Sequence, residues 1–109
     1  MGSFIVMTKD GYIYMLTNKH HTVLYIGVTS NLQKRVYEHK QHIYKNSFTD
    51  KYNIETLVHY ETYPNITAAI EREKVIKKWR REKKDALINE RNPEWKELYD
   101  NEQNILLHY

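Results

Sequence analysis

Cysteine is absent from the 109-residue sequence, and no apolar run is long enough to span a membrane. Without cysteine the protein has neither disulfides nor thiolate-bound metals, which fits a reducing compartment. The apolar stretch near the N-terminus is too short for a signal peptide. Linkers, low-complexity blocks and internal repeats are also missing. We therefore expect a cytoplasmic protein without membrane contacts, folded as one domain over residues 1–109.

Positive charge is modest overall but unevenly distributed. The formal net charge is +3, and seven of the eleven residues from Lys74 to Lys84 are Lys or Arg. Such a run usually lies on the solvated face of a helix. Alternatively it faces the phosphates of a nucleic acid, where clustered cations release counterions. Both interpretations remain open, and the cations expected to meet phosphate in the second are Lys77, Lys78, Arg81 and Lys84.

Two tyrosine-rich segments predict a β-hairpin. Residues 12–18, YIYMLTN, and residues 23–29, VLYIGVT, alternate with β-branched or aromatic residues, and KHHT separates them. Alternation along the two strands brings the side chains of Tyr14 and Tyr25 to the same side of the sheet. Gly27 removes a side chain just past Tyr25, as expected where a ligand approaches the backbone closely.

The rest of the chain predicts three helices and one further strand. In the first helix, over residues 29–44, His39 lies on an apolar stripe and Arg35 lies one turn earlier. The stripe is formed by Leu32, Val36 and Ile43. The other expected elements are a strand over 54–63, a long helix over 64–84 and a short helix with Asn92 as N-cap. The order β-β-α-β-α-α predicts an α+β fold in which helices flank a three-stranded, antiparallel sheet.

Together these segments resemble the GIY-YIG nuclease superfamily. The similarity is carried by YIY and YIG, then VTSNLQKRVYEHK, AAIEREKVIKKWRREKK and NPEW, over about residues 11–99. It is greatest to small stand-alone bacterial proteins related to the N-terminal domain of one component of excinuclease ABC. One difference is that Tyr12 replaces the first glycine of the family motif, and Gly11 lies one residue too early to fill that position.

The resemblance implies a set of site residues that each match a family position. They are the tyrosine of each triplet, the glycine of the second, an Arg–His helix pair and a metal-binding glutamate: Tyr14, Tyr25, Gly27, Arg35, His39 and Glu73. Helical periodicity alone leaves Glu71 and Glu73 at opposite edges of an apolar face, so only the resemblance selects Glu73. For the family's asparagine we take Asn92 over Asp85 and Asn89, although a capping role would also explain Asn92.

The activity that the resemblance implies is hydrolysis of phosphodiester bonds in DNA, in branched, nicked or damaged substrates such as those of DNA repair. Tyr14 or His39 would take the proton of the attacking water, directly or through each other. Arg35 would contact the phosphoryl oxygens, and Tyr25 would contact phosphate or position the water. Glu73 would hold one divalent ion, Mg²⁺ or Mn²⁺, largely through waters.

A second interpretation is a nucleic-acid-binding or partner-binding module of the same fold with little or no cleavage. The complete catalytic set favours the enzyme, because a binding module has no need of Glu73. With 109 residues we expect no separate DNA-binding domain, so the protein would bind weakly or need a protein partner for specificity. Taken singly, Tyr14 and Tyr25 are typical core residues, and His39 is typical of a hydrogen-bonded structural histidine.

Overall fold

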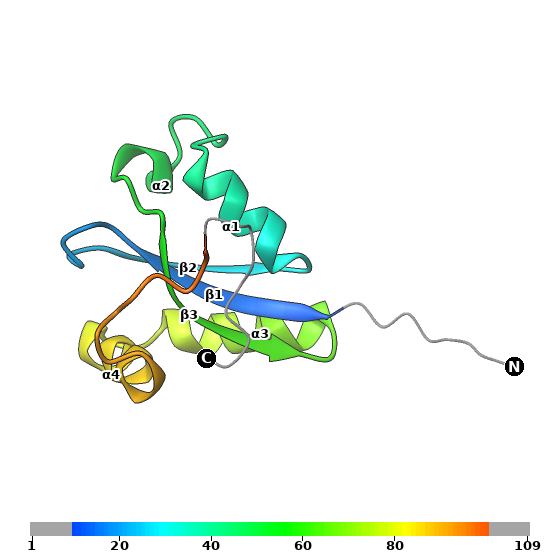
Figure 1. Ribbon diagram of the computed structural model, residues 1–109. Helices are drawn as coiled ribbons and strands as arrows, with labels where there is room; N and C mark the ends of the chain where they lie inside the picture. The colour runs from blue at the N-terminus through cyan, green and yellow to red at the C-terminus, as the bar shows by residue number, and fades with distance from the viewer. Residues whose placement is uncertain (1–9, 101–109) are drawn as a thin grey trace, which may run out of the picture.

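The computed structural model describes residues 10–100 and contains a three-stranded antiparallel sheet (Figure 1). The strands are β1 (Gly11–Thr17), β2 (Leu24–Thr29) and β3 (Thr56–Tyr63), and their order across the sheet is β2-β1-β3. β1 is therefore the central strand and is paired along both of its edges. The α+β class, the hairpin and the third strand predicted from the sequence are confirmed.

The pairing of β1 with β2 shows which side chains share a face of the sheet. Tyr14 lies opposite Gly27. Tyr14 packs into one apolar cluster together with the partly buried Tyr25. The neighbouring residues Ile13 and Met15 pack into a second cluster on the opposite face, as strand alternation requires. Tyr14 and Tyr25 therefore share one side of the sheet, as predicted.

Helices α1 (Leu32–Lys40) and α2 (Phe48–Lys51) lie on the Tyr14 side of the sheet (Figure 1). Asn31 caps α1, since its side chain accepts a hydrogen bond from the backbone N–H of Lys34. The buried residues of α1 are Leu32, Val36 and His39, so the predicted stripe is correct within the helix. This arrangement points Arg35 and His39 toward the tyrosine face.

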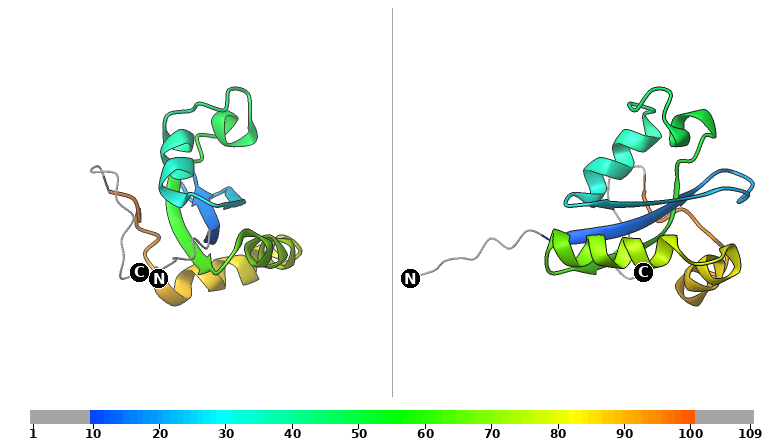
Figure 2. Two further views of the ribbon diagram at one scale, coloured as in Figure 1. Left: turned by 90° about the vertical axis from the view of Figure 1, so that its right-hand side faces the viewer. Right: turned by 180° about the vertical axis from the view of Figure 1, so that it is seen from behind.

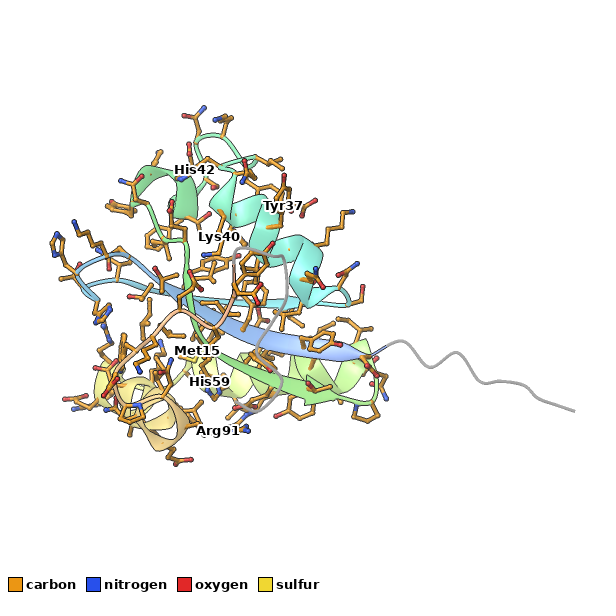
Figure 3. All side chains as sticks on the ribbon, in the orientation of Figure 1. Met15, Tyr37, Lys40, His42, His59 and Arg91 are labelled. Atoms are coloured by element: carbon orange, nitrogen blue, oxygen red, sulfur yellow. The ribbon has the colours of Figure 1, made fainter. Side chains whose placement is uncertain are left out.

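Helix α1 ends four residues earlier than predicted because the chain turns at His42, near the top of Figure 3. The backbone of His42 has a φ of 54°, and its ring lies within hydrogen-bonding distance of Asp50 and Glu55. Ile43, which was expected in the buried stripe, is instead 52% exposed. The turn leads into α2, a single turn that was not predicted and that Ser47 caps.

Helices α3 (Ile66–Lys77) and α4 (Arg81–Arg91) cover the opposite face of the sheet, as Figure 2 shows from two sides. Helix α3 packs mainly on β1 and β2, and α4 packs on β3. Gly11 allows α3 to begin close to β1: an added β-carbon there would lie 2.4 Å from the backbone oxygen of Asn65. The glycine that sequence reasoning set aside therefore has a structural role.

The prediction of one long helix over 64–84 is wrong. Helix α3 ends at Lys77, and a second helix starts at Arg81 after a turn through Trp79. The break lets Ile76 of α3 and Ile88 of α4 pack into one cluster under the sheet, which a straight helix would not allow. No glycine or proline marks this turn, so the sequence carried no signal for it.

The predicted short helix after Asn92 is also wrong. Asn92 is the C-cap of α4, and its buried side-chain amide donates to the backbone oxygens of Val58 and Lys96. The following segment runs back along the sheet, where the backbone N–H of Leu98 donates to Leu57. Within residues 10–100, no helix combines the length and apolar character needed to cross a membrane.

Candidate active site

Tyr14 lies at the centre of the candidate site. Its side chain is fully buried on β1, and its hydroxyl lies 3.1 Å from Nε2 of His39. Burial raises the pKa of Tyr14 well above 10, the nearby Tyr25 raises it further, and the positive charge of Arg35 opposes both. Tyr14 is therefore a protonated phenol at neutral pH, with a partner for its proton already in contact.

His39 reaches Tyr14 from α1. His39 is 6% exposed, and the second nitrogen of its ring, Nδ1, lies 3.1 Å from the hydroxyl oxygen of Thr49. Burial and the charge of Arg35 lower the pKa of His39 to about 4, so the imidazole is neutral near pH 7. When Nδ1 carries the hydrogen and donates it to Thr49, Nε2 is left free to accept the Tyr14 proton.

Arg35 and Tyr25 complete the cluster. The Tyr25 ring centroid lies 6.2 Å from that of Tyr14 and 5.5 Å from that of His39. Arg35 is one turn before His39 on α1, and its side chain is 38% exposed, so the side chain is partly open to solvent. The four residues that the sequence placed on two strands and one helix are therefore brought together in space.

Gly27 makes room for the Tyr14 hydroxyl. A β-carbon at position 27 would lie 2.4 Å from both Cζ and the hydroxyl oxygen of Tyr14. The close approach expected at this glycine is thus made by the catalytic candidate itself, across the β1–β2 pairing. Any larger residue would have to displace the aromatic ring, since contacts this short do not occur between real atoms.

Three further residues support the cluster and were not singled out from the sequence. Thr49 binds His39, and the Tyr44 ring lies 5.3 Å from the His39 ring and under the guanidinium of Arg35. The Tyr44 hydroxyl donates to Glu38, which also lies 3.6 Å from Arg35. Tyr44 lies in the turn after α1, and Thr49 lies in the single-turn helix α2. Both are in a stretch too short for a periodic pattern to predict which side chains turn inward.

Glu73 does not join this cluster through any hydrogen bond or ion pair within the described part of the chain. Its carboxylate lies 3.2 Å from the ammonium of Lys77, one turn later on α3. The Glu73 side chain is only 15% exposed, whereas that of Glu71, the alternative left open by periodicity, is 70% exposed. The sheltered position of Glu73 suits a specific role, such as holding an ion, better than the exposed position of Glu71 does.

Residues 10–100 offer few side-chain ligands for a metal ion. Over residues 10–100 no group of three or more His, Asp or Glu side chains is arranged to bind an ion. A hydrated divalent ion on the single Glu73 carboxylate fits, because hard cations such as Mg²⁺ keep most of their waters.

The four cations of the basic run have different surroundings. Lys77 and Lys78 end α3, whereas Arg81 and Lys84 lie in the first turn of α4, so the run spans two helices. The guanidinium of Arg81 donates to the backbone oxygens of His21 and Thr22 and to Asp85. It holds the β1–β2 turn against α4. The amide of Asn92 is likewise bonded to backbone, so these two residues have evident structural partners.

Known proteins share sequence with most of this chain. The family model described as the GIY-YIG catalytic domain matches residues 10–92. A UPF0213 protein from Syntrophus aciditrophicus is 38% identical over 88 residues, which cover 81% of this chain and 98% of the relative. A UPF0213 protein from Natronomonas pharaonis is 37% identical over 82 residues, covering 75% of this chain and 94% of the relative.

A solved structure has a similar fold. The solution NMR structure of a UPF0213 protein from Bacillus halodurans matches with a TM-score of 0.52 and 23% sequence identity. The match covers 81% of this chain and 92% of that protein. At 23% identity this match shows a similar fold and nothing more. The family of the chain is shown by the family model and the sequence relatives.

Proposed function

The chain belongs to the GIY-YIG family, a nuclease superfamily, and on that premise we propose that it is a metal-dependent endonuclease hydrolysing phosphodiester bonds in DNA. The observation that carries this proposal is the contact between the Tyr14 hydroxyl and the neutral ring of His39, with Arg35 beside them. A buried phenol bonded to a neutral imidazole provides a proton path, which a binding surface would not require.

The proton path follows from the two pKa directions. The pKa of Tyr14 is raised, so no phenolate exists at rest. The attacking water must therefore give its proton to the Tyr14 oxygen while Tyr14 passes its own proton to Nε2 of His39. The resulting hydroxide attacks phosphorus and the 3′-oxygen leaves. The negative charge of a bound phosphate raises the pKa of His39 and so favours this transfer.

Arg35 and Tyr25 act on the substrate. The exposed part of the Arg35 guanidinium can donate to two phosphoryl oxygens, where charge develops in the transition state. Tyr25, half-buried beside Tyr14, donates to phosphate or holds the water in line. A divalent ion on Glu73 would supply positive charge for the leaving oxygen. Lys77 then exchanges its contact with Glu73 for one with DNA phosphate.

The first prediction tests the metal role of Glu73. Glu73→Gln keeps the shape of the side chain but removes the charge that holds the ion. Cleavage should fall by about two to three orders of magnitude, because several kcal/mol of charge stabilisation is lost. DNA binding should persist or tighten. The assay uses labelled duplex, nicked, flapped, branched and single-stranded DNA, each with Mg²⁺, Mn²⁺ or EDTA.

Glu71→Gln is the matched control. It is two residues away on the same helix and also pairs with a lysine, Lys74, at 3.9 Å, but it is exposed. This variant should cleave as the wild type does. If the Glu73 variant still cuts with Mg²⁺, or the wild type cuts equally well in EDTA, the one-metal mechanism is wrong. A preference for branched or nicked DNA in the same panel would support a repair role.

The alternative function is a nucleic-acid-binding module, and one observation favours it. Glu73 is engaged by Lys77 rather than by the tyrosine cluster, as it would be if its role were only to stabilise α3. In that case the wild type binds DNA but cuts no substrate with any metal. A partner protein that supplies specificity would then be the natural next test.

A further inference from the structure

Two aromatic rings lie exposed on α2, on the same side of the sheet as the tyrosine cluster. Phe48 and Tyr52 are 49% and 52% exposed, and their ring centroids lie 4.9 Å apart. Phe48 is the first residue of α2 and Tyr52 directly follows its last residue. Large aromatic side chains usually contribute to a core. A short helix that leaves two of them open to solvent presents a small apolar surface.

The helix that carries these rings is tied to the candidate catalytic residues. Thr49, directly after Phe48, is buried and lies within hydrogen-bonding distance of Nδ1 of His39. Tyr44, at the other end of the same segment, contacts the ring of His39 and the guanidinium of Arg35. The exposed pair is therefore held by the same short segment that lines the site.

Two lysines lie close in sequence to the pair. Lys45 and Lys51 are exposed and take part in no ion pair within residues 10–100. The nearby carboxylate of Asp50 is already bound by the His42 ring and by the backbone N–H of Asn46. The segment thus combines two open rings with two exposed ammonium groups, which suits a ligand with flat apolar faces and a negative backbone.

We propose that Phe48 and Tyr52 form a stacking site for an unpaired base of the nucleic-acid strand whose phosphodiester enters the Tyr14–His39 cluster. The inference rests on the proposed function and adds a substrate class to it, namely single-stranded or locally unpaired nucleic acid. In a duplex the base faces are covered by their neighbours, so the rings would find no partner. Two half-exposed side chains are also far too small for a protein interface, which needs about 1,200 Å² or more.

The test compares binding with and without the rings. The probe is a fluorescein-labelled single strand about 12 nucleotides long, and the reference is its blunt duplex. Dissociation constants are measured by anisotropy in EDTA. Replacing both Phe48 and Tyr52 by Ser should weaken single-strand binding by about 10- to 100-fold, the usual effect of losing a base–aromatic stack. Duplex binding should be unchanged.

Two controls separate stacking from other effects. Val75→Ser removes an apolar side chain that is 48% exposed on α3, on the other face, and should change neither affinity. The double change of Phe48 and Tyr52 to Leu keeps apolar character without rings and should behave as the Ser variant. A normal thermal midpoint for both double variants checks that Thr49 and His39 remain in place.

An abasic series locates the base. One abasic site is moved along the probe. At one position the wild type should lose as much affinity for the probe as the double Ser change causes on the intact probe. The double Ser variant should lose no further affinity at that position, because the stack is already missing. The proposal is overturned if single-strand binding survives the Ser change, or if no abasic position matters. It is also overturned if the double Ser change alters only the self-association of the protein and not its affinity for the single strand. Because binding is measured in EDTA, its result does not depend on cleavage. A wild type that cuts no substrate in the assay with Mg²⁺ or Mn²⁺ would therefore count against the nuclease and not against the stacking site.

Discussion

Tyr14 and Gly27 face each other across the β1–β2 pairing, and the hydroxyl of one occupies the space that a side chain on the other would fill. Gly27→Ala should therefore push the Tyr14 ring away from His39. We expect a loss of cleavage of at least about tenfold and a destabilisation of about 1–3 kcal/mol, as for other overpacked sites. Steady-state cleavage and urea unfolding measure the two effects.

Tyr14→Phe provides the comparison. It removes only the hydroxyl, so cleavage should fall at least as far while the unfolding midpoint changes little. The Gly27 variant tests whether the position of the Tyr14 hydroxyl matters, and the Tyr14 variant tests whether the hydroxyl is needed at all. Wild-type cleavage by the Gly27 variant would mean that the Tyr14–His39 contact is not needed for the reaction.

The direction of a single side chain could be predicted where the residue lies in a strand or helix with a regular apolar pattern. Strand alternation brought Tyr14 and Tyr25 to one side, and the helical stripe turned His39 inward, as the structure confirms. Thr49 and Tyr44 could not be found in this way, because their inward direction depends on the turn at His42. The sequence shows no period there, and a positive φ at histidine has no reliable signature.

At the scale of elements, the basic run is divided between the end of α3 and the start of α4. Within the described residues, Lys77, Lys78 and Lys84 have no side-chain bonds to backbone comparable to those of Arg81. Changing the three lysines to Gln should weaken binding to all DNA sequences alike. If all three meet phosphate, the slope of log K against log salt should decrease by roughly 2 to 3.

Arg81→Gln is the contrasting variant. It should lower the unfolding midpoint, because the guanidinium holds the hairpin turn to α4, and it should leave the salt slope nearly as it was. The reverse outcome would be a flatter salt slope in the Arg81 variant and an unchanged slope in the triple lysine variant. That outcome would assign the phosphate contacts to Arg81. An unchanged slope in both would leave the run as a solvated surface.

The type of each long element was predictable, but the ends of helices were not. The 3.6-residue period over residues 64–84 is real, and it continues through a turn that only the packing of Ile76 and Ile88 explains. Asn92 carries the side chain of an N-cap and precedes a proline, yet it is used to close α4. Capping residues mark a helix end without stating which end it is.

For the molecule as a whole, two histidines give stability opposite dependences on pH. Burial and Arg35 lower the pKa of His39 from 6.5 to about 4, so the unfolded chain takes up this proton first as the pH falls. The stability contribution is complete above pH 6.5 and is lost on descent to pH 4, by on the order of 3 kcal/mol. In His39→Gln this part of the pH dependence should disappear.

His42 acts in the other direction. Hydrogen bonds to Asp50 and Glu55 raise its pKa, so its contribution is present below pH 6.5 and is lost as the pH rises through the raised value. His42→Gln should therefore cost more stability at pH 6 than at pH 9. Urea unfolding over a pH series measures both variants, with the exposed His20→Gln as control. Equal slopes in all three proteins would contradict this assignment.

The central position of β1 has a consequence for how the reaction is prepared. Four consecutive residues, Ile13 to Leu16, are fully buried between two strands and two helical layers, and Tyr14 is among them. In the proposed mechanism, a side chain held this firmly would need no reorganisation when its proton moves, so the cost of aligning it would be met during folding. Adjustment to the shape of a substrate would then fall to residues 41–53, whose backbone hydrogen bonds form turns and the single-turn helix α2 instead of a strand ladder.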